Sequence, residues 1–509
     1  MPRHAEPIAE RTTHSGRLGR RLALSAVLAC VLGSVAAPAA QASKTQESIF
    51  QDEGLLQSPD PGVQAGTLNQ MQELGVDTIH ALVGWGKIAP RPASRTKPNF
   101  DATNPDAYPD SGWAALDLLV NGATERKMDL ILSPVSKVPQ WAQDCNNARL
   151  RKLGTCEPDA KEFQRFVTAV GKRYPQVKRW SIWNEPNFKG WLSPQWIIKD
   201  RQIIPYGPIL YRKLFNAAVK GLGASGHGGD EIMFGETAPI GQLRGGETTN
   251  AMAPGLFLRE AMCLNPRGRP YRGKAARDRQ CRGVRRIRTN AISHHPYTKG
   301  GSRPPTAPVG KEEITLGYIS RLQRIMKQGQ RAGRLAANLP IYSTEYGFQT
   351  NPPDKFFGLP PDEQALYINE SDYIAYQNSQ IAGVAQYELI DDPLQSGFQT
   401  GLRFSNGEAK PSLDAYRLPI YVVRTGGGVA VYGQVRPAPD DVPQQVQIQV
   451  GSGGSFQTVE TVTTKDRGFF LANVPSQSGR WRLVWTDPRN NQQFVSRLAE
   501  VRDEPKRGR

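Results

Sequence analysis

Short apolar runs alternate with longer amphipathic stretches along residues 43–416, and this alternation constrains the fold more than any other feature. In the longer stretches apolar residues recur at steps of three and four, as in Phe163, Phe166, Val167 and Val170, which is typical of helices with one buried face. Strands that alternate with helices predict a parallel sheet, and eight such units close a (β/α)8 TIM barrel. The eight candidate strands are Ser48–Gln51, Val76–Val83, Met128–Pro134, Val177–Trp183, Ile232–Glu236, Ala291–His295, Ile341–Glu345 and Val384–Leu389. The clearest candidate helices are Val63–Leu74, Trp113–Lys127, Ala160–Tyr174, Leu210–Leu222, Glu313–Ala332 and Pro361–Ala382.

Residues 417–502 follow a different pattern, because short alternating runs separated by turn residues replace the helical periodicity. This predicts a small antiparallel β-sandwich domain, followed by a charged tail at 503–509. One interpretation is a domain that stabilises the barrel. The other is a carbohydrate-binding module in which Trp481, Trp485 and Tyr432 stack on sugars, although such rings more often fill a sandwich core.

Residues 1–42 have the features of a signal peptide. Arginines precede an apolar run, and Ala40-Gln41-Ala42 is a small-x-small cleavage pattern, so we expect a secreted chain cleaved near Ala42. A lipid anchor at Cys30 and a twin-arginine route at Arg20-Arg21 are the alternatives. No later run is long enough to predict a transmembrane segment.

Cleavage at that point would leave four cysteines, an even number that predicts disulfides in an exported protein. Four cysteines allow three pairings, and short loops favour Cys145–Cys156 and Cys263–Cys281. The alternative is a zinc site, but the spacings are wider than those of the usual zinc-ligand pairs.

The chain is strongly basic. Its net charge is +17, and loss of the five arginines and two glutamates of the signal would leave +14. Residues 267–288 hold ten basic side chains, opposed only by Asp278. They form either a solvated loop or a surface that attracts an acidic cell-wall polymer. No nucleic-acid-binding motif accompanies them, so we expect no nucleic-acid partner.

Two predicted strands end in a glutamate. Glu185 lies in Trp183-Asn184-Glu185-Pro186-Asn187, where Pro186 ends the strand because proline cannot donate to the ladder. Glu345 lies in Thr344-Glu345-Tyr346-Gly347 at the end of another strand. These would be the fourth and seventh strands of the barrel, whose carboxyl ends form the rim that holds active sites. Either glutamate alone could be a surface or salt-bridging residue, but the pair predicts a site with two facing carboxyl groups.

Two carboxyl groups about 5–5.5 Å apart can hydrolyse a glycosidic bond with retention of configuration. One attacks the anomeric carbon, while the other protonates the leaving oxygen and then activates water. We therefore expect Glu185 and Glu345 to share these two roles. No histidine, cysteine or acidic cluster has metal-ligand spacing, so we expect neither a metal nor an organic cofactor.

The barrel region resembles the clan A glycoside hydrolases, with similarity to families 5 and 39. Asn184-Glu185-Pro186 is similar to the strand-four motif of the acid/base glutamate, and Glu345 matches the strand-seven nucleophile. The resemblance implies that Asn184 binds the sugar 2-hydroxyl. Ser293-His294-His295-Pro296-Tyr297 is similar to a strand-six pattern, which implies that His295 lines a subsite and Tyr297 hydrogen-bonds the nucleophile.

The chain departs from the clan at strand two, where many members carry an arginine that keeps the nucleophile ionised. His80 occupies that position here, either as a substrate contact or as a core histidine. Trp141 and Tyr387 follow strand ends, where they are candidates for sugar stacking or for core packing. Glu236 is a further candidate to line the cleft, as are, less directly, Glu388, Asp391 and Asp392.

These observations predict a secreted, monomeric, retaining glycoside hydrolase that acts on a poly- or oligosaccharide. A transglycosylase on the same barrel would share the covalent intermediate. A non-catalytic carbohydrate- or cell-wall-binding protein is the alternative from a different class, although such a protein has no need of two opposed carboxylates.

Overall fold

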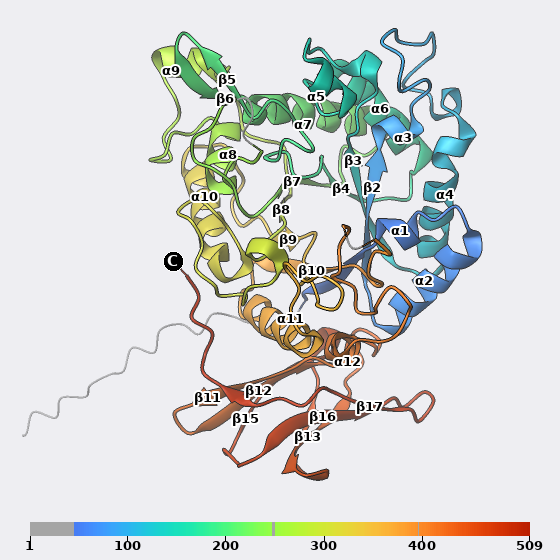
Figure 1. The fold of residues 1–509 in the computed structure, drawn as a ribbon, viewed down its shortest axis with the longest axis vertical. Coiled ribbons are helices and arrows are strands. Elements are labelled where there is room, and N and C mark those ends of the chain that lie inside the picture. Colours follow the sequence, from blue (N-terminus) through green and yellow to red (C-terminus); the bar gives the residue numbers. More distant parts are fainter. Residues whose placement is uncertain (1–44, 247–249, 395, 509) are drawn as a thin grey trace, which may run out of the picture. The chain divides into compact units, whose positions relative to one another are not determined.

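The structure is a computed structural model that describes residues 45–508, apart from 247–249 and 395 (Figure 1). The predicted signal peptide at 1–42, its cleavage point at Ala42 and Cys30 therefore lie outside the described residues. Within the described part of the chain, no helix combines the length and the apolar character that crossing a bilayer requires.

Eight parallel strands form a closed barrel in the order β1-β10-β9-β8-β7-β4-β3-β2. The ring closes where β1 pairs with β10 on one side, as in Ile49 opposite Ala385, and with β2 on the other, as in Ile49 opposite Thr78. All eight predicted runs become barrel strands, which confirms the (β/α)8 prediction. The strands are β1 (Glu47–Gln51), β2 (Thr78–Gly84), β3 (Asp129–Val135), β4 (Arg179–Ser181), β7 (Glu231–Thr237), β8 (Ala291–His294), β9 (Ile341–Ser343) and β10 (Ile381–Tyr387).

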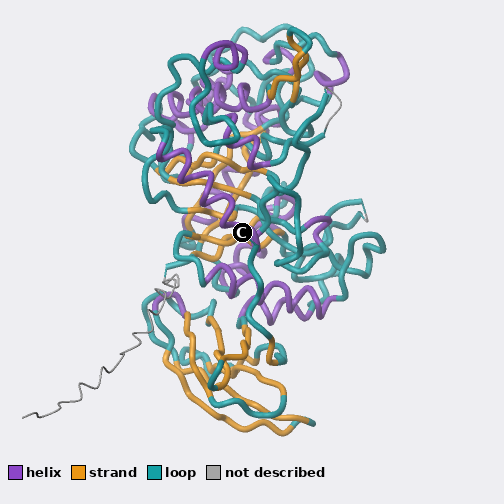
Figure 2. Tube along the Cα trace, turned by 90° about the vertical axis from the view of Figure 1, so that its left-hand side faces the viewer, coloured by secondary structure: helices purple, strands orange, loops and turns teal. Residues whose placement is uncertain are grey.

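Helices surround the barrel strands (Figure 2). Helix α6 shows why they form: the Asp159 side chain caps its first turn by accepting from the amides of Lys161 and Glu162, and its apolar face is buried. The longer helices are α2 (Pro61–Glu73), α4 (Asp110–Glu125), α6 (Ala160–Arg173), α7 (Gly207–Ala224), α10 (Ile319–Arg331) and α11 (Pro361–Tyr376). The shorter ones are α1 (Glu53–Leu56), α3 (Trp85–Ile88), α5 (Ala148–Lys152), α8 (Pro254–Ala261), α9 (Gly273–Asp278) and α12 (Pro411–Arg417).

The C-terminal region folds into two four-stranded sheets, ordered β15-β12-β11-β18 and β14-β13-β16-β17. Apolar side chains of both sheets, such as Val431 and Ile448, share one core, so the sheets form the predicted sandwich. Within it β11 and β18 pair in parallel. The strands are β11 (Ile420–Thr425), β12 (Gly428–Gln434), β13 (Gln445–Ser452), β14 (Ser455–Thr463), β15 (Phe469–Val474), β16 (Arg480–Thr486), β17 (Gln493–Val495) and β18 (Val501–Arg502).

The three aromatic residues considered as sugar platforms in the sandwich are buried. Trp481 and Tyr432 have no exposed surface, and Trp485 is 1% exposed. The two tryptophan rings fill the sandwich core, as the simpler interpretation predicts, whereas Tyr432 packs against Tyr373 and Tyr376 of α11. None of the three offers a face to a carbohydrate.

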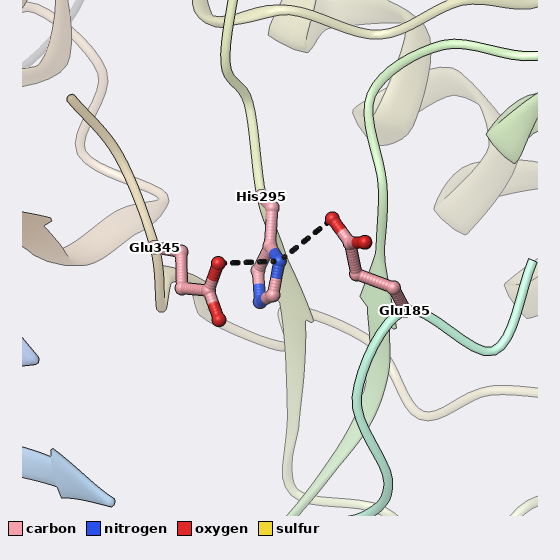
Figure 3. A group of neighbouring side chains, drawn as sticks. All are labelled: Glu185, His295 and Glu345. Carbon is pink, nitrogen blue, oxygen red and sulfur yellow. Dashed lines mark hydrogen bonds and ion pairs between the residues drawn. The ribbon is translucent and has the colours of Figure 1, made fainter. Parts of the chain in front are cut away.

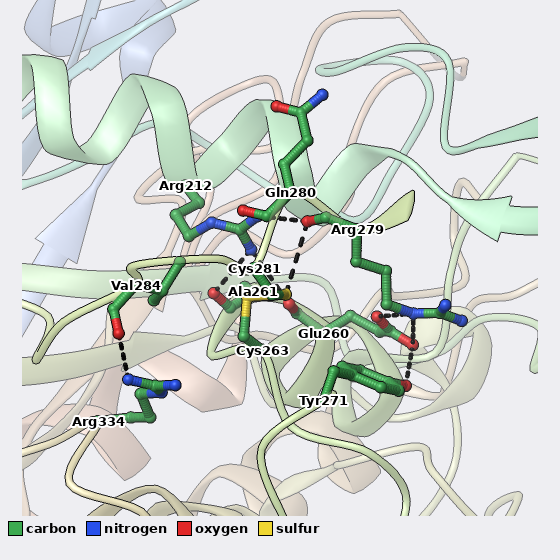
Figure 4. The surroundings of a disulfide bond; sticks show 10 residues. All are labelled: Arg212, Glu260, Ala261, Cys263, Tyr271, Arg279, Gln280, Cys281, Val284 and Arg334. Atoms are coloured by element: carbon green, nitrogen blue, oxygen red, sulfur yellow. Dashed lines mark hydrogen bonds and ion pairs between the residues drawn. A yellow bond between two sulfur atoms is a disulfide. The ribbon is translucent and has the colours of Figure 1, made fainter. Parts of the chain in front are cut away.

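Both predicted disulfides are present, Cys145–Cys156 and Cys263–Cys281. They engage all four cysteines, so the alternative zinc site is wrong. Around Cys263–Cys281, the buried Arg212 donates to the backbone carbonyls of Ala261 and Gln280, as Figure 4 shows. This bridge joins the basic segment to the barrel.

A hairpin of β5 (Trp196–Lys199) and β6 (Gln202–Pro205) is inserted after β4.

Candidate active site

A cavity of about 540 Å³ lies at the carboxyl ends of the barrel strands. Its lining includes the last residues of β1 and β10 and residues that follow β4, β8 and β9. This is the rim where barrel enzymes place their catalytic groups. The lining residues are Gln51, Glu53, Leu82, Asn184, Glu185, Trp191, Tyr297, Gly300, Gly301, Glu345, Gly347, Gln349, Phe357, Tyr387, Phe398 and Thr400.

The chain reaches Glu185 through an unusual backbone path. Trp183 and Glu185 have φ angles of 75° and 36°, in the left-handed region that side chains other than glycine rarely adopt. Such a residue costs about 1–3 kcal/mol and persists only where the surroundings hold it. Here the buried Trp183 ring packs edge-on against Phe163 and donates to the carbonyl of Trp191 at 3.2 Å. The two strained residues, Trp183 and Glu185, therefore lie just after the end of β4, where the chain leaves the barrel.

The structure brings the two predicted catalytic glutamates together, from the fourth and seventh barrel strands. One carboxylate oxygen of Glu185 and one of Glu345 lie within 4.8 Å of each other. His295 lies between them, with Nδ1 3.4 Å from an oxygen of each, as Figure 3 shows. This spacing fits the carboxyl separation of retaining enzymes, about 5–5.5 Å, and not the wider gap of inverting enzymes.

Glu345 is surrounded by hydrogen-bond donors. Gln51 Nε2 donates to Oε1 at 3.0 Å, and the Tyr297 hydroxyl donates to Oε2 at 3.3 Å. Oriented so that both its amide atoms are satisfied, Asn184 also donates to Glu345 Oε1 at 3.3 Å and accepts from Trp191 at 3.3 Å. Three donors converge on one carboxylate, an arrangement that favours its ionised form.

Burial has the opposite effect on the same group. Burial is the largest effect and raises the pKa of Glu345 to about 7. The charge of His295 lowers this pKa, whereas the carboxyl groups of Glu185 and Glu236 raise it. The balance of these effects keeps the pKa of Glu345 above that of a free carboxyl group.

His295 also contacts a third carboxyl group, that of Glu236. His295 Nε2 lies 2.6 Å from Glu236 Oε2, and neither side chain has exposed surface. Burial alone would lower the pKa of His295, but the carboxylates of Glu345 and Glu236 outweigh it and raise the pKa well above its usual value. As an imidazolium, His295 donates from both ring nitrogens, to Glu236 on one side and toward Glu185 and Glu345 on the other.

His80 does not reach the cavity. It is fully buried, with Nδ1 3.0 Å from the carbonyl of Thr344 and Nε2 2.8 Å from Ser133 Oγ. It also lies 3.8 Å from Glu236 Oε1, and burial lowers its pKa. The prediction of a substrate contact is therefore wrong for His80, because its ring is buried behind Glu236. The positive charge near Glu345 comes from His295 instead.

The two aromatic candidates have different positions. Tyr387 lines the cavity and meets Phe398 edge-on at 5.3 Å. Trp141 is not part of the lining, because its ring packs edge-on against Trp85 and Phe100 while its Nε1 donates to the carbonyl of Pro90. The prediction that Trp141 stacks on a sugar is replaced by the core-packing alternative.

Glu236, Glu388 and Asp391, which were candidates to line the cleft, are not part of the cavity lining. Glu236 supports His295 and does not line the cavity. Asp391 forms a buried ion pair with Lys410 at 2.6 Å, and Glu388 is 5% exposed. No sequence motif marks Gln51, Glu53, Phe357 or Phe398, which all line the cavity. The one available signal was that Gln51 and Glu53 follow the end of the first strand.

Glu185, His295 and Glu345 together offer three ligand atoms close enough to share a metal ion. A metal-ligating histidine must be neutral. The neighbouring carboxylates favour the charged form of His295, so a metal ion bound here would have to displace the proton of that ring.

No family model matches this chain, and no curated protein matches it either. Among solved structures, a glucosidase from Croceicoccus marinus shares 12% identity over 85% of this chain and 84% of its own, with a TM-score of 0.47. A monomeric beta-xylosidase from Caulobacter crescentus shares 15% identity over 91% and 98%, with a TM-score of 0.45. A family 1 β-glucosidase from Thermotoga maritima shares 10% identity over 74% and 97%, with a TM-score of 0.47. All three are glycosidases, but at these identities and TM-scores the similarity does not assign this chain to a family.

Proposed function

We propose that this protein is a retaining glycoside hydrolase that cleaves O-glycosidic bonds of a poly- or oligosaccharide. The observation that supports this is the approach of Glu185 and Glu345 to within 4.8 Å at the rim of the barrel, on the lining of one cavity. The number of donors at each carboxyl group supports the roles. Glu345 accepts from Gln51 and Tyr297, whereas the carboxyl group of Glu185 has one hydrogen-bond contact among the described residues, to His295.

In the first step Glu345 attacks the anomeric carbon, and the bond from that carbon to the leaving oxygen breaks. Glu185 gives its proton to that oxygen, so the leaving group departs as an alcohol. In the second step Glu185 takes a proton from water, whose oxygen attacks the anomeric carbon and releases Glu345. Asn184, next to both carboxyl groups, is placed to hold the 2-hydroxyl, where a hydrogen bond that strengthens in the transition state lowers the barrier.

The roles are tested with Glu345→Ala and Glu185→Ala on a panel of aryl glycosides. Loss of the nucleophile removes a covalent step, and loss of the acid/base costs roughly 10²–10⁴-fold. Added azide separates the two roles: it should give an inverted glycosyl azide with Glu345→Ala and a retained one with Glu185→Ala. Glu73→Gln, on the exposed end of α2, is the control. Full activity in either alanine variant would contradict the proposal.

Two alternatives share this geometry. A transglycosylase would give longer glycosides when the acceptor is concentrated, and a hydrolase would give free sugar. A non-catalytic carbohydrate-binding protein would bind glycans without turnover. Product analysis of the wild-type protein with an oligosaccharide distinguishes the three.

We also propose that the exported protein is a monomer that associates with an acidic cell-wall polymer through residues 267–288. Nine of the ten basic side chains of this segment are exposed, and the Cys263–Cys281 bridge fastens the segment to the barrel. Attraction of this kind weakens with salt, since the Debye length falls from about 10 Å at 0.1 M to 3 Å at 1 M. Adsorption to a polyanion that does not change between these salt concentrations would contradict it, and size-exclusion chromatography tests the monomer.

A further inference from the structure

A third carboxyl group lies in the cavity beside the proposed nucleophile. Glu53 begins α1, directly after the first barrel strand, and lines the cavity. Gln51 Nε2 lies 2.7 Å from Glu53 Oε1 and 3.0 Å from Glu345 Oε1. One amide group thus fixes two carboxyl groups on the same wall, so a sugar that reaches Glu345 also meets Glu53. The two-carboxylate mechanism assigns no task to this residue.

The charge of the lining is one-sided. Glu53, Glu185 and Glu345 are its ionisable acids, and none of the residues given above as lining the cavity is a lysine or an arginine. A ligand carboxylate taken out of water needs a cation or several donors as compensation. His295, the charged histidine beside Glu185 and Glu345, already faces three protein carboxyl groups, those of Glu185, Glu345 and Glu236. The cavity is therefore built for hydroxyl groups and not for anions.

The ionisation of Glu53 suits the same ligand. Burial, together with the carboxyl groups of Glu345 and Asp52, raises the pKa of Glu53 to about 8. At neutral pH the group therefore carries a proton, and a protonated carboxyl both donates and accepts hydrogen bonds. Adjacent hydroxyl groups of a sugar ring offer the matching acceptor and donor.

We propose that Glu53 is a specificity-determining residue, whose carboxyl group hydrogen-bonds the hydroxyl groups of the sugar bound beside Glu345, in a cavity that accepts uncharged sugars and rejects sugars that carry a carboxylate. This inference rests on the proposed glycosidase function and names its substrate class.

The test compares p-nitrophenyl glycosides of neutral sugars with the p-nitrophenyl glycoside of glucuronic acid. We expect the wild-type protein to hydrolyse at least one neutral glycoside and the glucuronide at least 100-fold less efficiently. Glu53→Ala should lower kcat/KM for the neutral substrate at least tenfold. The isosteric Glu53→Gln guards against a folding defect, and Glu73→Gln is the same change at an exposed site.

Deoxy analogues of the preferred substrate separate contact from structure. If Glu53 binds one hydroxyl, removing that hydroxyl from the substrate should lower kcat/KM much less in Glu53→Ala than in the wild-type protein. The losses from the two changes are then non-additive. A merely structural role would give additive losses with every analogue.

The outcomes distinguish the two levels of the proposal. If no glycoside is turned over by the wild-type protein, the proposed function fails. If Glu345→Ala abolishes hydrolysis but both Glu53 variants stay within twofold of wild type, or all losses are additive, the function stands and the role of Glu53 is overturned. Efficient hydrolysis of the glucuronide would overturn the substrate class.

Discussion

At the scale of single residues, a buried histidine supplies the charge that the resemblance to clan A assigns to an arginine. His80 occupies the arginine position but is hidden behind Glu236. His295 carries the charge, because Glu236 contacts one of its ring nitrogens while the two proposed catalytic carboxyl groups face the other. We therefore expect Glu236 to be a positioning residue, which acts on the proposed reaction through His295.

We expect Glu236→Gln to lower kcat on an aryl glycoside by tenfold or more while the fold is retained. Loss of the carboxylate removes one of the charges that raise the pKa of His295, so that pKa should fall. Histidine NMR titration measures it directly. The matched control is Glu231→Gln, at the opposite end of β7. An unchanged His295 titration together with an unchanged kcat would show that Glu236 has no such role.

Glu388 gives the stability of the protein a pH dependence. It is buried after β10, and its Oε2 has no hydrogen-bond partner among the described residues. Burial, with the nearby Asp52 and Asp392, raises its pKa to about 10. The unfolded value is about 4.3, so the folded state holds the extra proton between these pH values. The free energy of unfolding should therefore fall as pH rises through this window.

Glu388→Gln removes this titration. We expect the variant and the wild-type protein to have similar stability near pH 5, and the variant to be the more stable one near pH 9. The difference grows by at most about 1.4 kcal/mol per pH unit. Urea unfolding at several pH values measures it. A difference that stays constant with pH would mean that Glu388 is ionised in the folded protein.

The sequence allowed the meeting of Glu185 and Glu345 to be predicted, because a strand followed by Asn184-Glu185-Pro186 places its glutamate on the carboxyl-end rim of the barrel. The supporting residues were harder to assign. Whether His80 or Trp141 faces a cavity or the core depends on side-chain packing across strands far apart in the chain, for which sequence spacing carries no signal. Our proposal gives Glu53 a function because Gln51 connects it to Glu345. Gln51 and Glu345 are 294 positions apart in the sequence, so no local pattern predicts this contact.

At the scale of elements, apolar runs predicted every barrel strand because parallel strands are buried on both faces. The predicted helix Pro361–Ala382 overran its end: α11 stops at Tyr376, since Ile381 begins β10 and pairs with β9. Strand β11 begins only three residues after α12 with no turn signal before it, so the sequence does not mark where this strand starts. The β5–β6 hairpin was missed because it is a short insertion between barrel units.

The segments after β9 and β10 present phenylalanines at the cavity. Phe357 and Phe398 line it while remaining 56% and 48% exposed. Exposed rings of this kind suit the apolar face of a sugar or an aryl leaving group, and each contact contributes about 0.5–1.5 kcal/mol. We expect Phe357→Ala and Phe398→Ala each to raise KM for an aryl glycoside roughly two- to tenfold with little change in kcat, because such binding acts equally on substrate and transition state.

Phe356→Ala is the matched control, since this neighbour is 86% exposed and does not line the cavity. Its steady-state parameters should equal those of the wild-type protein. A fall in kcat with unchanged KM in the Phe357 or Phe398 variant would mean that the ring acts on the transition state and not on binding.

At the scale of the whole molecule, the sandwich is joined to helix α11 by polar and aromatic contacts. Arg436 and Asp372 form an ion pair at 2.6 Å, with both side chains 7% exposed. Tyr373 stacks on Tyr421 with ring centroids 5.2 Å apart. These contacts, and the burial of the sandwich tryptophans, support the interpretation that this region stabilises the barrel.

Arg436→Ala tests that interpretation, because it leaves the carboxyl group of Asp372 buried without its cation. Breaking a buried pair in this way costs about 3–5 kcal/mol. The control is Arg424→Ala, whose partner Asp503 lies at 3.6 Å with both side chains largely exposed, and which should cost less than about 1 kcal/mol. Urea midpoints compare the two variants at equal m-values.

If the sandwich serves stability alone, folded Arg436→Ala keeps the wild-type KM for an oligosaccharide, because the ion pair is not part of the cavity lining. An unchanged midpoint with a raised KM would instead make this region a substrate-binding module.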